Sequence, residues 1–248
     1  RSTQGRLGDA LRTYERGLEL VSPEVGHVLR GTADMYVGLS QIACERDDLQ
    51  AAMEHLRRAR ELGEHTWMPQ NPYRWRVAMA RIREAEGDLD GARELLDEAQ
   101  RVYMGDVSPH VRPVPAMRAR VLAKQGRLGD ALAWAREQGL SAEDDLSYLR
   151  EFEHMTLARV LLARSRAEHS QPLTREVAKL LERLLQAAEA GERTGTVIEI
   201  LVLRALTHQT LGDIPAALAS VARAVTLPEP EGYVRVFVAE GPLLPSLL

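Results

Sequence analysis

The sequence contains a single cysteine, Cys44, among 248 residues. One thiol cannot form an intramolecular disulfide or a multi-cysteine metal site, so the chain suits a reducing compartment and we expect a cytoplasmic protein. No apolar run approaches the roughly 18 to 20 residues that span a bilayer, and the opening RSTQGRLGDA lacks the apolar core of a signal peptide. We therefore expect no contact with a membrane.

The sequence also lacks an excess of charge of either sign. Its 32 Lys and Arg residues are offset by 36 Asp and Glu residues, which leaves a net charge of -4. This balance argues against direct contact with nucleic acid. The lysines, Lys124 and Lys179, each follow Ala, so the GxxxxGK[ST] loop that cradles phosphates is missing, and so is GxGxxG after a strand. We expect no cofactor in this part of the protein.

Catalytic and metal-binding patterns are missing as well. The seven histidines never form HxxxH or HExxH, and no GxSxG surrounds a serine. The neighbouring carboxylates Asp47 and Asp48 fall at a predicted turn, where helix capping accounts for them. We therefore predict no metal site, no catalytic residues and no enzyme activity.

An internal repeat is what the sequence does contain. The octapeptide QGRLGDAL occurs at residues 4–11 and again at 125–132, and variants of it begin at Arg46, Gly87 and Gly212. If the glycine or its replacement marks each unit, the marks are Gly5, Asp47, Gly87, Gly126 and Gly212. They lie 42, 40, 39 and 86 residues apart, so the last interval contains one more unit. A fixed period in this range is typical of a solenoid built from stacked helical hairpins.

The residues around each mark have the spacing of a helical hairpin. Small or apolar residues follow at offsets of five, nine and twelve, as in Ala52, Leu56 and Ala59, and so lie on one helical face. A small residue precedes each mark by seven positions and allows close helix packing: Ser40, Ala80, Ala119 and Ala205. The glycine is expected to end the first helix with a positive φ, and Asp48, Asp88 and Asp213 are expected to cap the second.

The additional unit begins at LARVLLARS, residues 157–165, with Ala158 in the small position. Here Ser165 is expected to replace the glycine, followed by an insertion, AEHSQPLT, that enlarges the turn. The second helix is then predicted to resume around Arg175, with Leu181, Leu185 and Ala188 on its buried face.

This pattern resembles tetratricopeptide repeats, although units near forty residues exceed the standard length of about 34. It predicts an all-α fold, a right-handed superhelical solenoid of about five to six hairpins, with HEAT-like hairpins as the alternative. The predicted repeat domain spans residues 1–227, with a separate C-terminal segment at 228–248. Its units lie near residues 1–25, 28–65, 72–105, 111–140, 149–191 and 194–227.

The position six residues before each turn suggests a binding surface. In tetratricopeptide-like solenoids this side of the first helix lines the concave groove, and here Arg81, Arg120 and Arg159 would form a ladder. A guanidinium ladder suits carboxylates, phosphates or an acidic peptide. The alternative is that these arginines pair with Glu45, Glu84 and other carboxylates of the chain. The same predicted face adds Gln41, Arg74, Lys124 and Gln209.

A second candidate site is the segment TWMPQNPYRW, residues 66–75, which concentrates aromatic side chains in a chain with only 4% of them. Trp67, Tyr73 and Trp75 could stack on a sugar or a peptide. Alternatively, they fill the space between adjacent hairpins. Cys44, three residues before its turn, has the parallel alternatives of a packed thiol and a redox sensor.

The C-terminal segment carries a resemblance to a known family. The run EPEGYVRVFVAEGPLLPSLL, residues 229–248, resembles the end of the sensor solenoid in the MalT-like branch of LuxR-type bacterial transcription regulators. The stretches ARIREAEGDLDGAR and LVLRALTHQTLGDIPAAL, residues 80–93 and 201–218, are similar to that family too.

The resemblance implies a modular protein of the STAND class: an upstream ATPase that binds ATP, a helical middle, this sensor and a downstream helix-turn-helix. Since the first octapeptide begins inside a repeat, we expect this chain to be a piece of such a protein. The implied partners are a small-molecule inducer or regulatory protein, the protein's own ATPase domain and other protomers. The implied function is inducer sensing and oligomerisation; the alternative is a free-standing tetratricopeptide adaptor that binds a partner protein or peptide.

Overall fold

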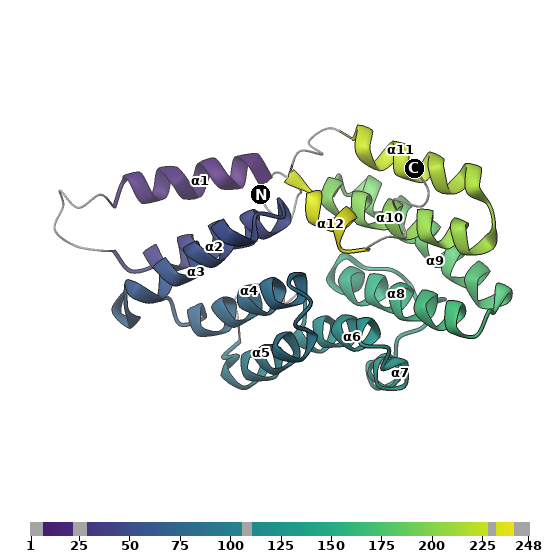
Figure 1. Cartoon of the computed structure of the whole chain (residues 1–248), viewed down its shortest axis with the longest axis horizontal. Helices are drawn as coiled ribbons and strands as arrows, with labels where there is room; N and C mark the ends of the chain where they lie inside the picture. Colours follow the sequence, from purple (N-terminus) through teal and green to yellow (C-terminus); the bar gives the residue numbers. More distant parts are fainter. Residues whose placement is uncertain (1–6, 22–28, 106–110, 228–231, 241–248) are drawn as a thin grey trace. The chain divides into compact units, whose positions relative to one another are not determined.

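The computed structural model describes residues 7–21, 29–105, 111–227 and 232–240. These ranges form helices and contain no strand, which confirms the predicted all-α repeat fold (Figure 1). The chain folds as two compact units. Unit 1 comprises Arg6–Ser108 and Glu231–Arg235, and unit 2 comprises Pro109–Pro230 and Val236–Leu248.

Unit 1 contains a single helix followed by two hairpins and a short 3-10 turn between them. Its elements are α1 (Leu7–Glu19), α2 (Thr32–Glu45), α3 (Leu49–Glu61), η3 (Glu64–Thr66), α4 (Asn71–Ala85) and α5 (Leu89–Val102). Helix α2 pairs with α3, and α4 pairs with α5.

Unit 2 contains three further hairpins, formed by α6 with α7, α8 with α9, and α10 with α11. Its elements are α6 (Val114–Lys124), α7 (Leu128–Glu137), η4 (Tyr148–Arg150), α8 (Glu151–Ala167), α9 (Gln171–Ala190), α10 (Thr194–Leu211) and α11 (Ile214–Thr226). The short α12 (Val234–Val238) is divided between the units after Arg235.

The five hairpins within the described residues turn in the same way. One residue adopts a positive φ between the helices, and the next N–H donates to a carbonyl five residues earlier, as from Asp88 to Arg83 at 2.9 Å. This is the hydrogen bond of the Schellman motif. Glycine is expected at the positive-φ position because it has no Cβ, and Gly87, Gly126 and Gly212 occupy it with φ of 85°, 75° and 81°. Gly5, in the first octapeptide, lies outside the described residues.

The structure corrects the prediction for the hairpin of α8 and α9. Ser165 is buried inside α8, not at a turn, and Arg175 lies inside α9. The positive-φ residue is His169, with φ of 53°, and Ser170 caps α9. The turn is therefore as short as the others, and the additional residues lengthen the helices instead of the loop.

The start signals of the second helices are confirmed where they were predicted. Asp48, Asp88 and Asp213 each accept a hydrogen bond from a backbone N–H three residues later. Proline occupies the second position of α4, α6, α9 and α11. It is favourable there because proline has no N–H to donate, and the N–H groups of the first turn have no acceptor within the helix.

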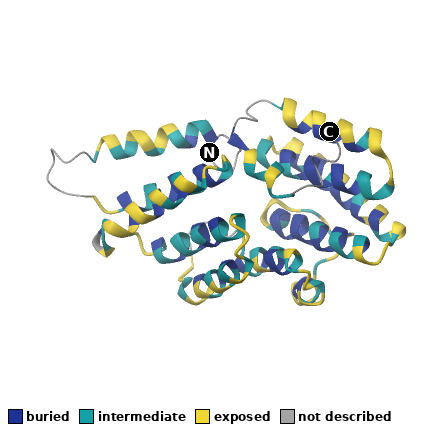
Figure 2. Ribbon diagram, viewed as in Figure 1, coloured by how far each residue is buried: buried dark blue, intermediate teal, exposed yellow. Residues whose placement is uncertain are grey.

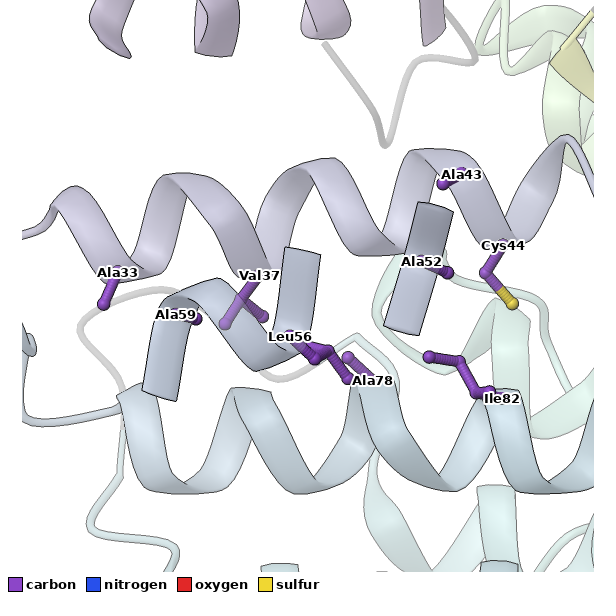
Figure 3. Close-up of a cluster of buried hydrophobic side chains, with 9 residues drawn as sticks. All are labelled: Ala33, Val37, Ala43, Cys44, Ala52, Leu56, Ala59, Ala78 and Ile82. Atoms are coloured by element: carbon purple, nitrogen blue, oxygen red, sulfur yellow. The ribbon is translucent and has the colours of Figure 1, made fainter. Parts of the chain in front are cut away.

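The core lies between the helices of each hairpin and its neighbours, where Figure 2 shows the buried residues. The predicted small residues are all buried: Ser40, Ala80, Ala119 and Ala205. In unit 1, Ala52, Leu56 and Ala59 of α3 are fully buried and pack with residues of α2 and α4 (Figure 3). Cys44 belongs to this cluster, which confirms the packed thiol.

Helix α1 packs on α2 as the second helix of a preceding repeat would. The aromatic ring of Tyr14 lies against Gly38, where an added Cβ would be 2.3 Å from Tyr14 Cζ. Since real Cβ contacts are never this short, a glycine at this position is what allows the two helices to approach.

Candidate functional site

The residues predicted to line one groove are divided between the two units. Gln41, Arg74 and Arg81 belong to unit 1, and Arg120, Lys124, Arg159 and Gln209 belong to unit 2. Within unit 2, the structure brings Arg120 of α6 and Arg159 of α8 together at one carboxylate. Lys124 is the last residue of α6, and Gln209 lies in the last turn of α10.

In unit 1, Arg81 forms an ion pair with Glu45 of α2. Its Nη2 donates to Glu45 Oε1 at 2.7 Å, and both side chains are less than a third exposed. The nearby Glu45 raises the pKa of Arg81 above its usual range. The pairing with Glu45 that the sequence left as an alternative is therefore the arrangement in the structure. Arg74 lies 3.7 Å from Asp34 and is more exposed.

The aromatic residues of the segment at 66–75 pack within unit 1. The ring of Tyr73 is buried and lies 5.0 Å from that of Tyr103. Trp75 donates its indole N–H to Leu56 O at 3.1 Å, and Trp67 is half-buried against the core of α2, α3 and α4. These contacts match the packing alternative, and binding of a ligand by this segment stays a prediction.

Unit 2 contains a denser arrangement around Glu199 of α10. Arg120 Nη1 donates to Glu199 Oε1 at 2.7 Å, and Arg120 Nε donates to the hydroxyl of Thr156 at 2.8 Å. The guanidinium lies 3.9 Å from the ring centroid of Phe152, a cation–π contact. Arg120 Nη2 is buried and has no hydrogen-bond partner in the part of the chain that the structure describes.

Arg159 donates hydrogen bonds to two carboxylates. Its Nη2 donates to the same Glu199 Oε1 at 3.1 Å, and its Nη1 donates to Glu240, which follows α12 in the C-terminal segment. Since the turn lies at His169, Arg159 is ten residues before it, and Ala163 holds the position six residues before it. Arg159 is thus one helical turn from the predicted register but on the same face.

Two more arginines lie close to Arg120, Arg159 and their carboxylates. Arg112 lies 5.5 Å from the ring centroid of Phe152, and Arg166 donates to Thr210 Oγ1 at 3.0 Å and to Leu206 O at 3.1 Å. We refer to four arginines and two glutamates as the arginine cluster: Arg112, Arg120, Arg159, Arg166, Glu199 and Glu240.

The pKa shifts in the arginine cluster reflect burial and an excess of positive charge. Burial lowers the pKa of Arg120 to about 10, although Glu199 acts in the opposite direction. Burial alone would raise the pKa of Glu199, but Arg120, Arg159 and Arg112 lower it to about 2. Burial alone would likewise lower the pKa of Arg159, but Glu240 and Glu199 raise it above its usual range.

Sequence reasoning found two of these arginines and missed their partners. Glu199 lies 40 residues from Arg159 and 79 from Arg120, and Glu240 lies 81 residues from Arg159, so each glutamate comes from an element beyond the hairpin of its arginine. One signal was available: Glu199 is the only acidic residue of α10, whose other residues are mainly apolar. A single carboxylate in such a helix requires a cationic partner if it is buried.

This arrangement is suited to holding oxyanions. Guanidinium groups bind carboxylates and phosphates with directed, charge-assisted hydrogen bonds. Over the described ranges, no three or more His, Cys, Asp or Glu side chains are grouped to hold a metal ion, and none of the described helices is long and apolar enough to cross a membrane.

Comparison with known proteins gives the family. A family model described as the MalT-like TPR region matches residues 1–248. The chain belongs to the MalT-like TPR family. This region is therefore a tetratricopeptide-like helical-repeat domain, a class that generally provides interaction surfaces and not catalytic centres.

Other comparisons are more distant. No curated protein matches the sequence of this MalT-like TPR region at a significant level. Among solved structures, the crystal structure of BtubC (BKLC) from P. vanneervenii is similar to it, with 15% sequence identity and a TM-score of 0.47. The match covers 90% of this chain and 88% of that one.

Proposed function

We propose that this region is the inducer-sensing and protein-interaction domain of a MalT-like LuxR-family transcription regulator and has no catalytic activity of its own. In this proposal ATP and DNA are bound by other parts of a longer bacterial protein. The region works in the cytoplasm, in keeping with its single buried thiol. Sensing requires that the inducer bind one arrangement of the regulator more tightly than another.

The observation that supports a binding role is the arginine cluster of unit 2. Around Glu199 and Glu240 there are four guanidiniums, so the positive charge exceeds the negative charge. Arg120 Nη2, a buried donor, lacks a partner among the described residues. A buried donor without an acceptor is costly, and a bound oxyanion would remove that cost. The proposed inducer is accordingly an anion.

Thermal unfolding of the 248-residue chain tests this proposal with citrate, succinate, inorganic phosphate and a Glu-rich peptide, each at constant ionic strength set with NaCl. A ligand at about 100 times its Kd stabilises the protein by about 2.7 kcal/mol, or roughly 5 to 10 °C for a chain of this size. We expect this shift for a small anion in the wild type and its loss in Arg120→Gln and Arg159→Gln.

Arg81→Gln is the matched control, because Arg81 forms an ion pair in unit 1 and not in the arginine cluster. It should retain the full response. If Arg120→Gln responds like the wild type, the arginine cluster is not the site. Binding of the Glu-rich peptide without any small anion would favour the adaptor alternative, and a longer gene without an upstream ATPase or a downstream helix-turn-helix would contradict the regulator.

A further inference from the structure

The C-terminal segment contributes a carboxylate to the arginine cluster from outside the repeats. Glu240 follows α12, and its Oε1 accepts a hydrogen bond from Arg159 Nη1. The side chain of Glu240 is only 13% exposed, and its charge also acts on Arg166. Glu240 therefore places an anionic group where the proposed inducer would bind.

Arg159 does not need Glu240 to be paired. Its Nη2 and Nε both donate to Glu199 Oε1, at 3.1 and 3.4 Å, and Glu199 lies within helix α10. Arg120 shares this oxygen and has an Nη2 with no partner among the described residues. Removal of Glu240 would leave donors on two neighbouring guanidiniums, which one oxyanion with several oxygens could bond at the same time.

We propose that Glu240 is an internal occupant of the anion site, which a small anionic ligand displaces from Arg159. The ligand carries two or more carboxylate or phosphate oxygens, bonds Arg159 in place of Glu240 and also bonds Arg120 Nη2. Displacement exchanges one ion pair for another at Arg159. The net gain in binding free energy therefore comes from the new hydrogen bond to Arg120 Nη2. This inference rests on the proposed function, because it concerns the same site and adds how the protein itself competes for it.

The competition has a measurable consequence for affinity. Because Glu240 is tethered to the same chain, it competes at an effective concentration of the order of millimolar. Glu240→Gln removes its charge while keeping its size. We expect this variant to bind citrate or phosphate about tenfold more tightly than the wild type, since the ligand no longer has to displace a charge-assisted hydrogen bond.

Isothermal titration of the 248-residue chain with citrate, and separately with inorganic phosphate, measures this difference. Glu45→Gln is the matched control, because it also removes the charge of a largely buried carboxylate that pairs with an arginine, but this pair lies in unit 1. Its affinity should equal that of the wild type, which excludes an effect of net charge alone. A preference for citrate over phosphate, or the reverse, identifies which oxyanion chemistry the site takes.

Hydrogen exchange gives an independent measurement on the unmodified protein. If the ligand displaces Glu240, amides of residues 236–240 should exchange several-fold faster when citrate or phosphate is bound. Equal affinities of the wild type and Glu240→Gln, with ligand binding still dependent on Arg120, would refute displacement and leave the proposed function intact. Failure of every variant to bind any of these anions would refute the proposed site and this inference together.

Discussion

Arg81 in unit 1 and Arg120 in unit 2 hold the same repeat position, six residues before the turn of their hairpins, but have different surroundings. Arg81 pairs with Glu45, whose charge, together with a smaller effect of Glu84, raises the pKa of Arg81. Arg120 shares Glu199 with Arg159, and burial lowers its pKa to about 10. The positive charge of Arg81 is thus balanced by a carboxylate partner, whereas Arg120 shares its carboxylate with a second arginine.

This difference shows that a repeat position by itself does not determine a role. The carboxylate partner of Arg81 comes from the preceding hairpin, 36 residues earlier, as expected for neighbouring repeats. The partner of Arg120 comes from α10, beyond the adjacent hairpin. The arginine cluster thus draws charges from several elements, and its incomplete compensation is what a ligand could use.

Removal of the shared carboxylate should have the largest effect. Glu199→Gln leaves the buried guanidiniums of Arg120 and Arg159 without their common anion, and breaking such a buried arrangement costs about 3 kcal/mol. Glu45→Gln breaks a single, more exposed pair and should cost about 1 kcal/mol. Urea unfolding followed by circular dichroism measures both, and equal losses would remove the distinction between the units.

Acid should produce a comparable effect by protonating the same carboxylate. The folded pKa of Glu199, about 2, is below its ordinary value of 4.5. Its contribution to stability is thus complete above pH 4.5 and is lost as the pH falls toward 2, by about 3 kcal/mol in total. The gap in urea midpoint between the wild type and Glu199→Gln should therefore narrow steadily as the pH falls from 5 to 2.5. A gap that stays constant would show that the charge of Glu199 does not stabilise the fold.

The cation–π contacts extend the comparison with a smaller effect. Arg120 lies 3.9 Å from the ring centroid of Phe152 in unit 2, whereas the exposed Arg60 lies 5.4 Å from that of Trp75 in unit 1. Double-mutant cycles with Arg→Gln and aromatic→Leu changes should give a coupling of about 1 kcal/mol for the first pair and about 0.5 kcal/mol or less for the second. The reverse order would mean that burial does not strengthen the contact in unit 2.

The sequence was sufficient for the repeat because its signals are local. Capping aspartates, turn glycines and small residues act within one hairpin, and Asp88, Gly87 and Ala80 lie where the spacing placed them. The arginine cluster was only partly predictable, because Glu199 and Glu240 lie in other elements, 40 to 81 residues from the arginines that they contact. Nothing in the repeat pattern indicated the division into two units.

The misplaced turn at Ser165 has a physical reason as well. The prediction relied on a small residue near the expected position, but helices α8 and α9 have 17 and 20 residues, longer than the helices of the three hairpins before them. The residue that takes the positive φ is His169, and histidine enters the left-handed region more readily than most residues. With His169 as the mark, the interval of 86 residues divides into 43 and 43.

The turn residues provide the smallest test of how the units differ. Asp47 in unit 1 and His169 in unit 2 both adopt a positive φ, which costs a side chain other than glycine about 1 kcal/mol. His169 is exposed, so His169→Gly should relieve this cost and stabilise the protein by about 0.5 kcal/mol after the added freedom of the unfolded chain is counted. Asp47→Gly relieves the same strain but removes the ion pair with Arg235 at 2.7 Å, so this variant should be no more stable than the wild type. Urea midpoints compare the two variants, and an equal gain in both would show that the Asp47–Arg235 pair does not stabilise unit 1.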